Sequence, residues 1–266
     1  NQFLSIAAQS DALLHVVDAS ASIDSSGRIT ETGTGDPVSD FADIEEELNM
    51  WYQKILEGNR EKLQKMIKSE NDHISALTEL YQGLGVKKSH VMESLRLTGL
   101  EGKNIENYDL HDSKKLSTQL RKISKPTLIV ANKIDIPGAD KNFVRLRERY
   151  NDMIVVPASA DSELTLRRAE QKDLIKYSPG SELFDILKTS ELNQKQKGAL
   201  DFIKKDIMGE YMRTGVQFAI NVTVFKLLKM NSIYPVANPE NLSDKKGRVL
   251  PDLVLLKDGA TVVDLA

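Results

Sequence analysis

Three short apolar runs constrain the fold of this chain more than any other feature of its sequence. They read ALLHVV from Ala12 to Val17, TLIVA from Thr127 to Ala131 and MIVV from Met153 to Val156, and a small or polar loop follows each. Continuous apolar runs, unlike alternating ones, are expected of strands that are buried on both faces of a parallel sheet. The sequence therefore predicts three strands of one parallel sheet.

Helical patterns separate these strands. Leu116, Leu120 and Ile123 recur at helical spacing before the second run, and KNFVRLRERY does the same before the third. Strands that alternate with helices imply right-handed crossovers and an α/β fold, which we expect to be a doubly wound, mostly parallel sheet. Such sheets bind their ligands at the carboxyl ends of the strands, so the residues just after each run are the candidates for function.

A long helical segment lies between the first two strands. Asp36 and Pro37 form a helix start, and a narrow apolar seam follows at Phe41, Ile44, Leu48, Trp51 and Ile55. Gly58 and Asn59 interrupt the helix, and a second pattern runs from Leu63 to Leu84. We predict an antiparallel helical hairpin inserted at residues 36–99. The alternative is that these helices belong to the main core.

The texture of the sequence changes near Ser232. IYPVA, a polar turn and then PDLVLLKDG, from Pro251 to Gly259, read as two strands before a helix start, which is half of a small α+β module. We therefore expect an α/β domain at 1–35 and 100–230, the helical insertion at 36–99, and the beginning of a second module at 231–266.

Composition excludes several classes of function. The chain has no cysteine, which rules out disulfides, zinc thiolate sites and thiol nucleophiles, and which suits a reducing cytosol. No apolar run approaches the roughly 20 residues that span a bilayer, so no membrane role is expected. The net charge of -3 argues against a chain that mainly coats nucleic acid.

The loop after the second strand reads Asn132-Lys133-Ile134-Asp135, and its pattern of asparagine, lysine, any residue and aspartate can recognise guanine. The carboxylate of Asp135 can accept the two adjacent donors of guanine, N1–H and N2–H₂, which adenine lacks at that edge. Lys133 would lay its aliphatic stem along the base with its ammonium near solvent or the ribose. Asn132 would tie this loop to its neighbours.

The loop after the third strand supports that interpretation. In PASAD, Ser159 and Ala160 match a second base-contact loop, in which the N–H of Ala160 would donate to guanine O6. The first motif alone would arise by chance in roughly one chain in twenty of this length, and a plain strand-end turn is the alternative. Two such loops after consecutive strands favour a nucleotide site.

The histidines and the glycine-rich patterns give little evidence of further functional sites. His15 lies within an apolar run, where a core histidine is expected, and His73, His90 and His111 are too scattered for a metal cluster. No G-x-x-x-x-G-K-[ST] loop occurs in the sequence, so we expect neither catalytic residues nor metal ligands in this chain.

With these motifs the chain resembles the Obg-related GTPases of the YchF type, specifically their archaeal branch. The resemblance covers NQFL, DALLHVVDA, ANKID, PASADSELTLRRA, TGVQFAIN and the closing IYPVANPENLSDKKGRVLPDLVLLKDGATVVDLA. It implies a P-loop GTPase fold with a coiled-coil insertion, followed by the start of a ubiquitin-like β-grasp TGS domain. It also implies GTP or GDP as ligand, Mg²⁺ in the intact protein, hydrolysis of GTP and a cytoplasmic location.

The resemblance further implies that the P-loop, the switches and the catalytic groups lie upstream of Asn1, and most of the TGS domain downstream of Ala266. Many relatives depart from the N-K-x-D pattern and favour ATP, whereas Asn132, Lys133 and Asp135 favour guanine here. Two alternatives stay open. The chain could be an ATP-preferring relative, or a ribosome- or RNA-binding module that uses the insertion and the TGS segment while nucleotide only regulates it.

Overall fold

The computed structural model describes residues 2–24, 26–70, 72–250 and 252–265 of the chain. Their contacts divide it into two compact units, residues 1–219 and 220–266. Asn1, Pro251 and Ala266, which delimit segments predicted from the sequence, lie outside the described residues. None of the described helices is both long enough and apolar enough to cross a membrane.

A three-stranded parallel sheet forms the centre of the first unit. Its strands are β1 (Leu13–Asp18), β2 (Thr127–Asn132) and β3 (Val155–Pro157), in the order β1-β2-β3. β1 pairs with β2 from Leu13↔Thr127 to Asp18↔Asn132, so these two strands end level with each other. The predicted α/β fold with a parallel sheet is confirmed.

The burial of the strands differs from the prediction in one respect. β2 lies between its two neighbours and is buried on both faces, as its continuous apolar run indicated. In β1, however, burial alternates, and the side chains of Leu14 and Val16 are 41% and 57% exposed. The reason is that successive side chains of a strand point to opposite faces of the sheet. Leu14 and Val16 share one face, whereas His15 points to the other, where the ring of Phe41 packs against it.

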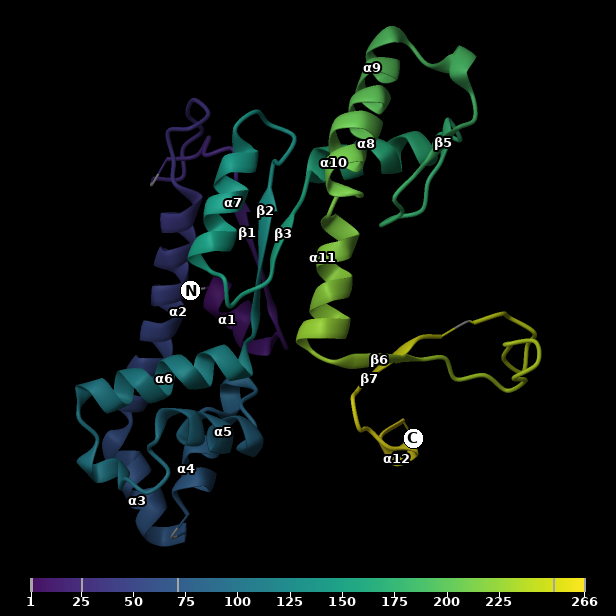
Figure 1. Ribbon diagram of the computed structural model, residues 1–266. Coiled ribbons are helices and arrows are strands. Elements are labelled where there is room, and N and C mark those ends of the chain that lie inside the picture. The colour runs from purple at the N-terminus through teal and green to yellow at the C-terminus, as the bar shows by residue number, and fades with distance from the viewer. Residues whose placement is uncertain (1, 25, 71, 251, 266) are drawn as a thin grey trace. The chain divides into compact units, whose positions relative to one another are not determined.

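Two helices cover one face of this sheet, α2 (Pro37–Gly58) and α7 (Ala139–Arg149) (Figure 1). The predicted helix start is present, since the carboxylate of Asp36 accepts a hydrogen bond from the backbone N of Val38 at 3.2 Å and Pro37 is the first helical residue. Phe41 of α2 packs between the rings of His15 and Tyr150, with centroids 4.7 and 4.6 Å away. The first turns of α2 thus belong to the core of the sheet.

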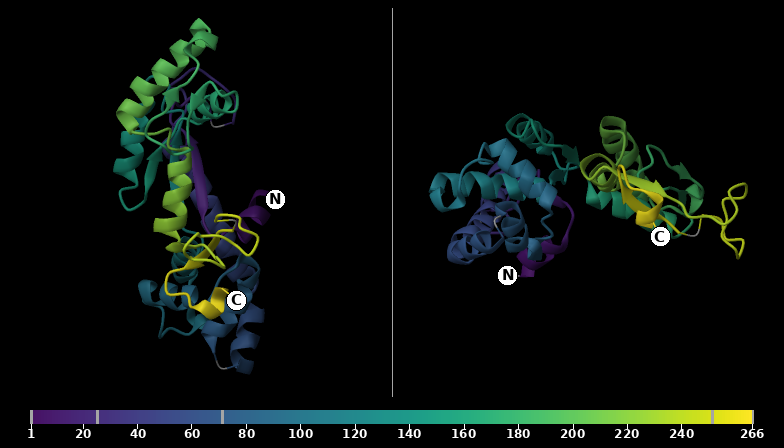
Figure 2. Two further views of the ribbon diagram at one scale, coloured as in Figure 1. Left: turned by 90° about the vertical axis from the view of Figure 1, so that its right-hand side faces the viewer. Right: turned by 90° about the horizontal axis from the view of Figure 1, so that it is seen from below.

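The far end of α2 belongs to a second, purely helical core. At 1.5 Å per residue a helix of this length extends about 33 Å, beyond the amino ends of the strands. There it packs against α6 (Leu110–Ser124), and Figures 1 and 2 show a further group of helices at that end. They are α3 (Arg60–Glu70), α4 (His73–Leu80) and α5 (Lys88–Thr98).

The reversal of the predicted helical hairpin lies elsewhere than expected. Asn59 separates α2 from α3 without folding one back along the other, whereas α3 and α4 are joined by two residues and pack side by side. Asp72 begins α4 by accepting hydrogen bonds from the backbone N of Ile74 and Ser75, at 2.9 and 3.3 Å. This cap starts a new helix in the middle of the predicted second one, and α2 pairs with α6 instead.

The last part of the first unit has its own apolar cluster. It joins α8 (Ala160–Glu170), the short strand β4 (Ile175–Lys176), α9 (Gln194–Phe202) and α10 (Met208–Tyr211). β4 pairs with the antiparallel strand β5 (Asp185–Ile186). Leu166, Leu174, Leu200 and Ile203 are buried within it. A left-handed turn at Gly215 then leads into α11 (Val216–Val222).

The second unit contains a β-hairpin. β6 (Met230–Ile233) pairs antiparallel with β7 (Val254–Lys257), and a short helix, α12 (Val262–Leu265), follows. Two strands before a helix start agree with the order predicted for this segment, although the first strand begins before the IYPVA run and not within it.

Candidate functional site

The loops that follow the three parallel strands meet at one end of the sheet. The backbone N of Ala19 donates to the carbonyl of Asn132 at 2.9 Å, which joins the first loop to the second. The second and third loops are joined at Ala158, whose N donates to Ala131 at 2.9 Å and whose carbonyl accepts from Ile134 at 3.1 Å. The sheet therefore brings both sequence-predicted motifs into one constellation.

Asn132 ties these loops together, as its role in the motif predicted. Its Oδ1 accepts a hydrogen bond from the backbone N of Ala160 at 3.1 Å. This N–H is the group that the sequence assigned to a guanine carbonyl, and here it has a partner within the chain. A ligand carbonyl that binds there must share this donor with Asn132 or replace it.

Lys133 has an unusual backbone and a paired ammonium. Its φ is +63°, in the left-handed region that residues with a side chain adopt at a cost of roughly 1–2 kcal/mol. Its Nζ donates to Oδ2 of Asp18 and to Oγ of Ser22, at 2.9 Å each. The ammonium therefore lies against the first loop, whereas the sequence interpretation placed it near solvent or the ribose.

Asp135 is the one member of the motif whose side chain is unengaged within the described part of the chain. Its carboxylate is partly exposed and makes neither a hydrogen bond nor an ion pair with any described residue. Ile134, just before it, is buried and anchors the loop to the sheet. Asp135 is thus held on a fixed backbone with both oxygens open to donors.

Ser159 is a structural residue in this arrangement. Its side chain is fully buried, and its Oγ caps α8 by accepting from the backbone N of Ser162 at 3.2 Å. Its own backbone N donates to the carbonyl of Thr214 at 2.8 Å. Of the serine-alanine pair, Ser159 is buried and Ala160 is exposed.

Sequence reasoning missed Glu163 and Thr214, whose hydrogen bonds hold the third loop in place. Glu163 is buried and accepts hydrogen bonds from Oγ1 of Thr214 at 2.5 Å, from the hydroxyl of Tyr177 at 2.8 Å and from Nε of Arg167 at 2.6 Å. Burial alone would raise the pKa of Glu163, but these hydrogen bonds outweigh it and lower the pKa. No local pattern marks Thr214 as a neighbour of this glutamate.

Asp18 was missed too, although a signal was present. It is the last residue of β1, at the same level as Asn132, and an acidic residue at the carboxyl end of a parallel strand is a candidate by position alone. Its Oδ1 accepts from the backbone N and the Oγ of Ser20, at 3.0 and 2.6 Å. Its Oδ2 accepts from the backbone N and the Oγ of Ser22, at 3.1 and 2.7 Å, besides Lys133.

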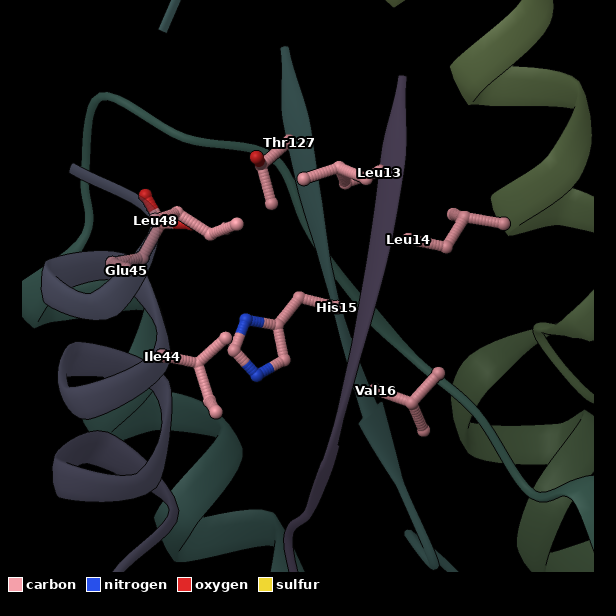
Figure 3. Close-up of a pocket in the computed structure, with 8 residues that line it drawn as sticks. All are labelled: Leu13, Leu14, His15, Val16, Ile44, Glu45, Leu48 and Thr127. Atoms are coloured by element: carbon pink, nitrogen blue, oxygen red, sulfur yellow. The ribbon is translucent and has the colours of Figure 1, made fainter. Parts of the chain in front are cut away.

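His15 lies apart from these loops, in the wall of an apolar pocket of about 330 Å³ between β1 and α2. Figure 3 shows its ring pointing toward Ile44 of α2, whereas Leu14 and Val16 point to the other side of the strand. Burial, and then the positive charge of Arg121, lower the pKa of His15 to about 4, so the imidazole is neutral at pH 7. This agrees with the core role that its apolar run predicted.

Comparisons with known proteins agree on one family. A family model described as Obg-like GTPase YGR210-like, G4 motif-containing domain matches residues 130–238, which include both base loops. A GTP-binding protein of Methanocaldococcus jannaschii, described as uncharacterized, is 40% identical over 266 residues, all of this chain and 66% of the relative. One from Schizosaccharomyces pombe, described likewise, is 29% identical over 275 residues, 98% of this chain and 65% of the relative.

A solved structure supports the same assignment. The crystal structure of a GTP binding protein from Pyrococcus horikoshii OT3 matches 99% of this chain and 69% of its own, with a TM-score of 0.77 and 33% identity. This chain thus spans just under two thirds of the length of the two curated relatives and slightly more of the solved one.

Proposed function

Because this chain belongs to the family of Obg-like GTPases, we propose that it is the part of a GTP-binding protein that recognises the guanine base of the nucleotide. We propose that Asp135 selects that base. One observation carries the proposal. A carboxylate without a partner among the described residues, Asp135, and the backbone N–H of Ala160 stand in two loops that hydrogen bonds join directly. Guanine is complementary to this pair, since N1–H and N2–H₂ match the carboxylate and O6 matches the N–H.

Adenine fits the same loops poorly. Its corresponding edge offers no pair of donors, so Asp135 would lose water without gaining hydrogen bonds. An unpaired polar group in a binding site costs roughly 1–3 kcal/mol, and more when it is charged. At 1.36 kcal/mol per tenfold, this predicts a preference for guanine of at least about 5- to 150-fold.

The proposal assigns the phosphates to other residues of the full-length protein. The 266 residues contain no G-x-x-x-x-G-K-[ST] loop. The described residues include no group of three or more histidine, aspartate or glutamate side chains that could hold a metal ion. We propose that the full-length protein binds Mg²⁺ with GTP and hydrolyses GTP. The 266-residue chain alone is expected to bind GTP weakly and not to turn it over, and measurable turnover would refute that expectation.

The remaining proposals rest on the family resemblance of the sequence. They are the domain boundaries (1–35 with 100–230, 36–99 and 231–266), the coiled-coil nature of the insertion and the TGS identity of the last segment. A cytoplasmic location and a ribosomal or RNA partner are proposed on the same ground. A ribosomal partner predicts that the full-length protein sediments with ribosomal subunits, that deletion of the insertion weakens this, and that binding falls as salt rises. No co-sedimentation at low salt would argue against it.

The guanine proposal is tested by titrating the full-length protein with fluorescent GDP and ADP. We expect tighter GDP binding, and tighter ADP binding would overturn the assignment of Asp135. In Asp135→Asn, the amide can donate one hydrogen bond to a carbonyl. The affinity for GDP should therefore fall, and the affinity for xanthosine diphosphate, which carries a carbonyl at C2, should rise. Asp161→Asn is the matched control, because it removes an exposed carboxylate next to Ala160 and should leave the preference unchanged.

A further inference from the structure

The carboxylate of Asp18, at the end of β1, is held by hydrogen bonds to both of its oxygens. Each of its carboxylate oxygens accepts a backbone N–H and a hydroxyl from the serines that follow it, Ser20 on one side and Ser22 on the other. Its side chain is only 7% exposed. A carboxylate held by four hydrogen bonds within its own turn has little freedom to move.

The carboxylate of Asp18 forms an ion pair with Lys133. Its Nζ lies 2.9 Å from Oδ2 of Asp18, and Ser22 contributes a second acceptor at 2.9 Å. The two residues stand 115 positions apart in the sequence and meet because β1 and β2 pair in register up to Asp18 and Asn132. The turn that presents Lys133 has a left-handed backbone, and the ion pair ties the tip of the side chain to a neighbouring strand.

We propose that Asp18 is a positioning residue for nucleotide binding, which acts through Lys133. The inference rests on the proposed function and on the expectation from the sequence that the aliphatic stem of Lys133 covers one face of the base. A lysine side chain loses rotamer freedom when it orders over a ligand, and an ion pair formed in advance removes much of that cost from the binding step. Asp18 therefore raises affinity for the base without touching the nucleotide.

The expected effect is moderate. The side chain of Lys133 is 38% exposed, so water screens its pair with Asp18 and reduces its strength. Replacing Asp18 by Asn keeps one acceptor for the turn but removes the charge that holds the ammonium. We expect Asp18→Asn to weaken GDP binding by about 3- to 10-fold, chiefly through faster dissociation.

The decisive experiment is a double-mutant cycle in the full-length protein. Wild type, Asp18→Asn, Lys133→Met and the double variant are titrated with fluorescent GDP, and with ADP in parallel. If Asp18 acts through Lys133, the loss caused by Asp18→Asn disappears in the Lys133→Met background. An equal loss in both backgrounds, or no loss in either, would overturn the proposal. Asp152→Asn, at an exposed carboxylate before β3, is the control and should change nothing.

Two further measurements exclude a merely structural role. A base-side effect should weaken GDP and GTP equally, so a loss confined to GTP would place Asp18 at the phosphates and refute the inference. Ser22→Ala removes one acceptor of Lys133 and one hydroxyl donor to Asp18 but leaves the ion pair, so it should give a smaller loss in the same direction. This variant covers the case in which Asp18→Asn unfolds. If ADP binds more tightly than GDP, the proposal that Asp135 selects guanine is refuted. The double-mutant cycle measured with ADP still decides whether Asp18 acts through Lys133.

Discussion

Gly215 offers the sharpest test of how the third base loop is supported. Its φ is +87°, and a Cβ added there would lie 2.0 Å from the carbonyl oxygen of Pro157 and 2.8 Å from Cα of Ala158. Both neighbours are backbone atoms of the segment from the last residue of β3 to Ser159, so no side chain can rotate away to relieve the clash. An alanine at this position must displace either the base loop or the start of α11.

The size of the effect follows from two contributions. Alanine in the left-handed region costs roughly 1–2 kcal/mol. Overpacking at a site that cannot relax typically adds about 1–3 kcal/mol. Together they predict that Gly215→Ala lowers the free energy of unfolding by about 2–5 kcal/mol, which corresponds to a fall of roughly 4–9 °C in the unfolding midpoint for a chain of this size.

The assay is thermal unfolding followed by circular dichroism, with GDP affinity measured on the same samples of full-length protein. Gly215→Ala should also lower the affinity for GDP, because the displaced segment carries Ala158 and the N–H of Ala160. Gly198→Ala is the matched control. It lies within α9 with nothing within 4 Å of the added Cβ and should stabilise by about 0.5–1 kcal/mol. An unchanged midpoint in Gly215→Ala would show that the close approach to Pro157 is absent.

Two other perturbations follow from buried polar groups. Tyr81→Phe removes the hydrogen bond from the buried hydroxyl to the carbonyl of Tyr52 at 2.8 Å, and should cost about 1 kcal/mol in urea unfolding, whereas Tyr234→Phe, at an exposed ring, should cost nothing measurable. Glu163 has a lowered pKa, so its charged form stabilises the fold above its unfolded pKa of about 4.3, and this contribution is lost as the pH falls through the folded value. Wild type should therefore exceed Glu163→Gln in stability at pH 7, and the difference should shrink below about pH 4. A difference that grows in acid would contradict the hydrogen bonds assigned to this glutamate.

The helical insertion shows where sequence periodicity stops being informative. The apolar seam of α2 located the helix and its start at Asp36 and Pro37 correctly. It did not show that the reversal falls between α3 and α4, or that α2 pairs with α6. Asp72, a polar residue inside a helical pattern, was the local sign of that break. The choice of partner depends on which apolar faces meet in three dimensions, which helical spacing does not encode.

The sequence by itself determined where the strands lie along the chain and which loops carry the candidate site. Apolar runs identify buried strands locally, and parallel strands bring their carboxyl ends together, so Asn132, Asp135 and Ala160 could be placed near one another without coordinates. Only the tertiary structure decided what holds those loops. Asp18 pairs with Lys133, and Glu163 with Thr214, through contacts between residues far apart in the chain. Such contacts depend on strand register and on the packing of loops against one another, and no short stretch of sequence specifies either.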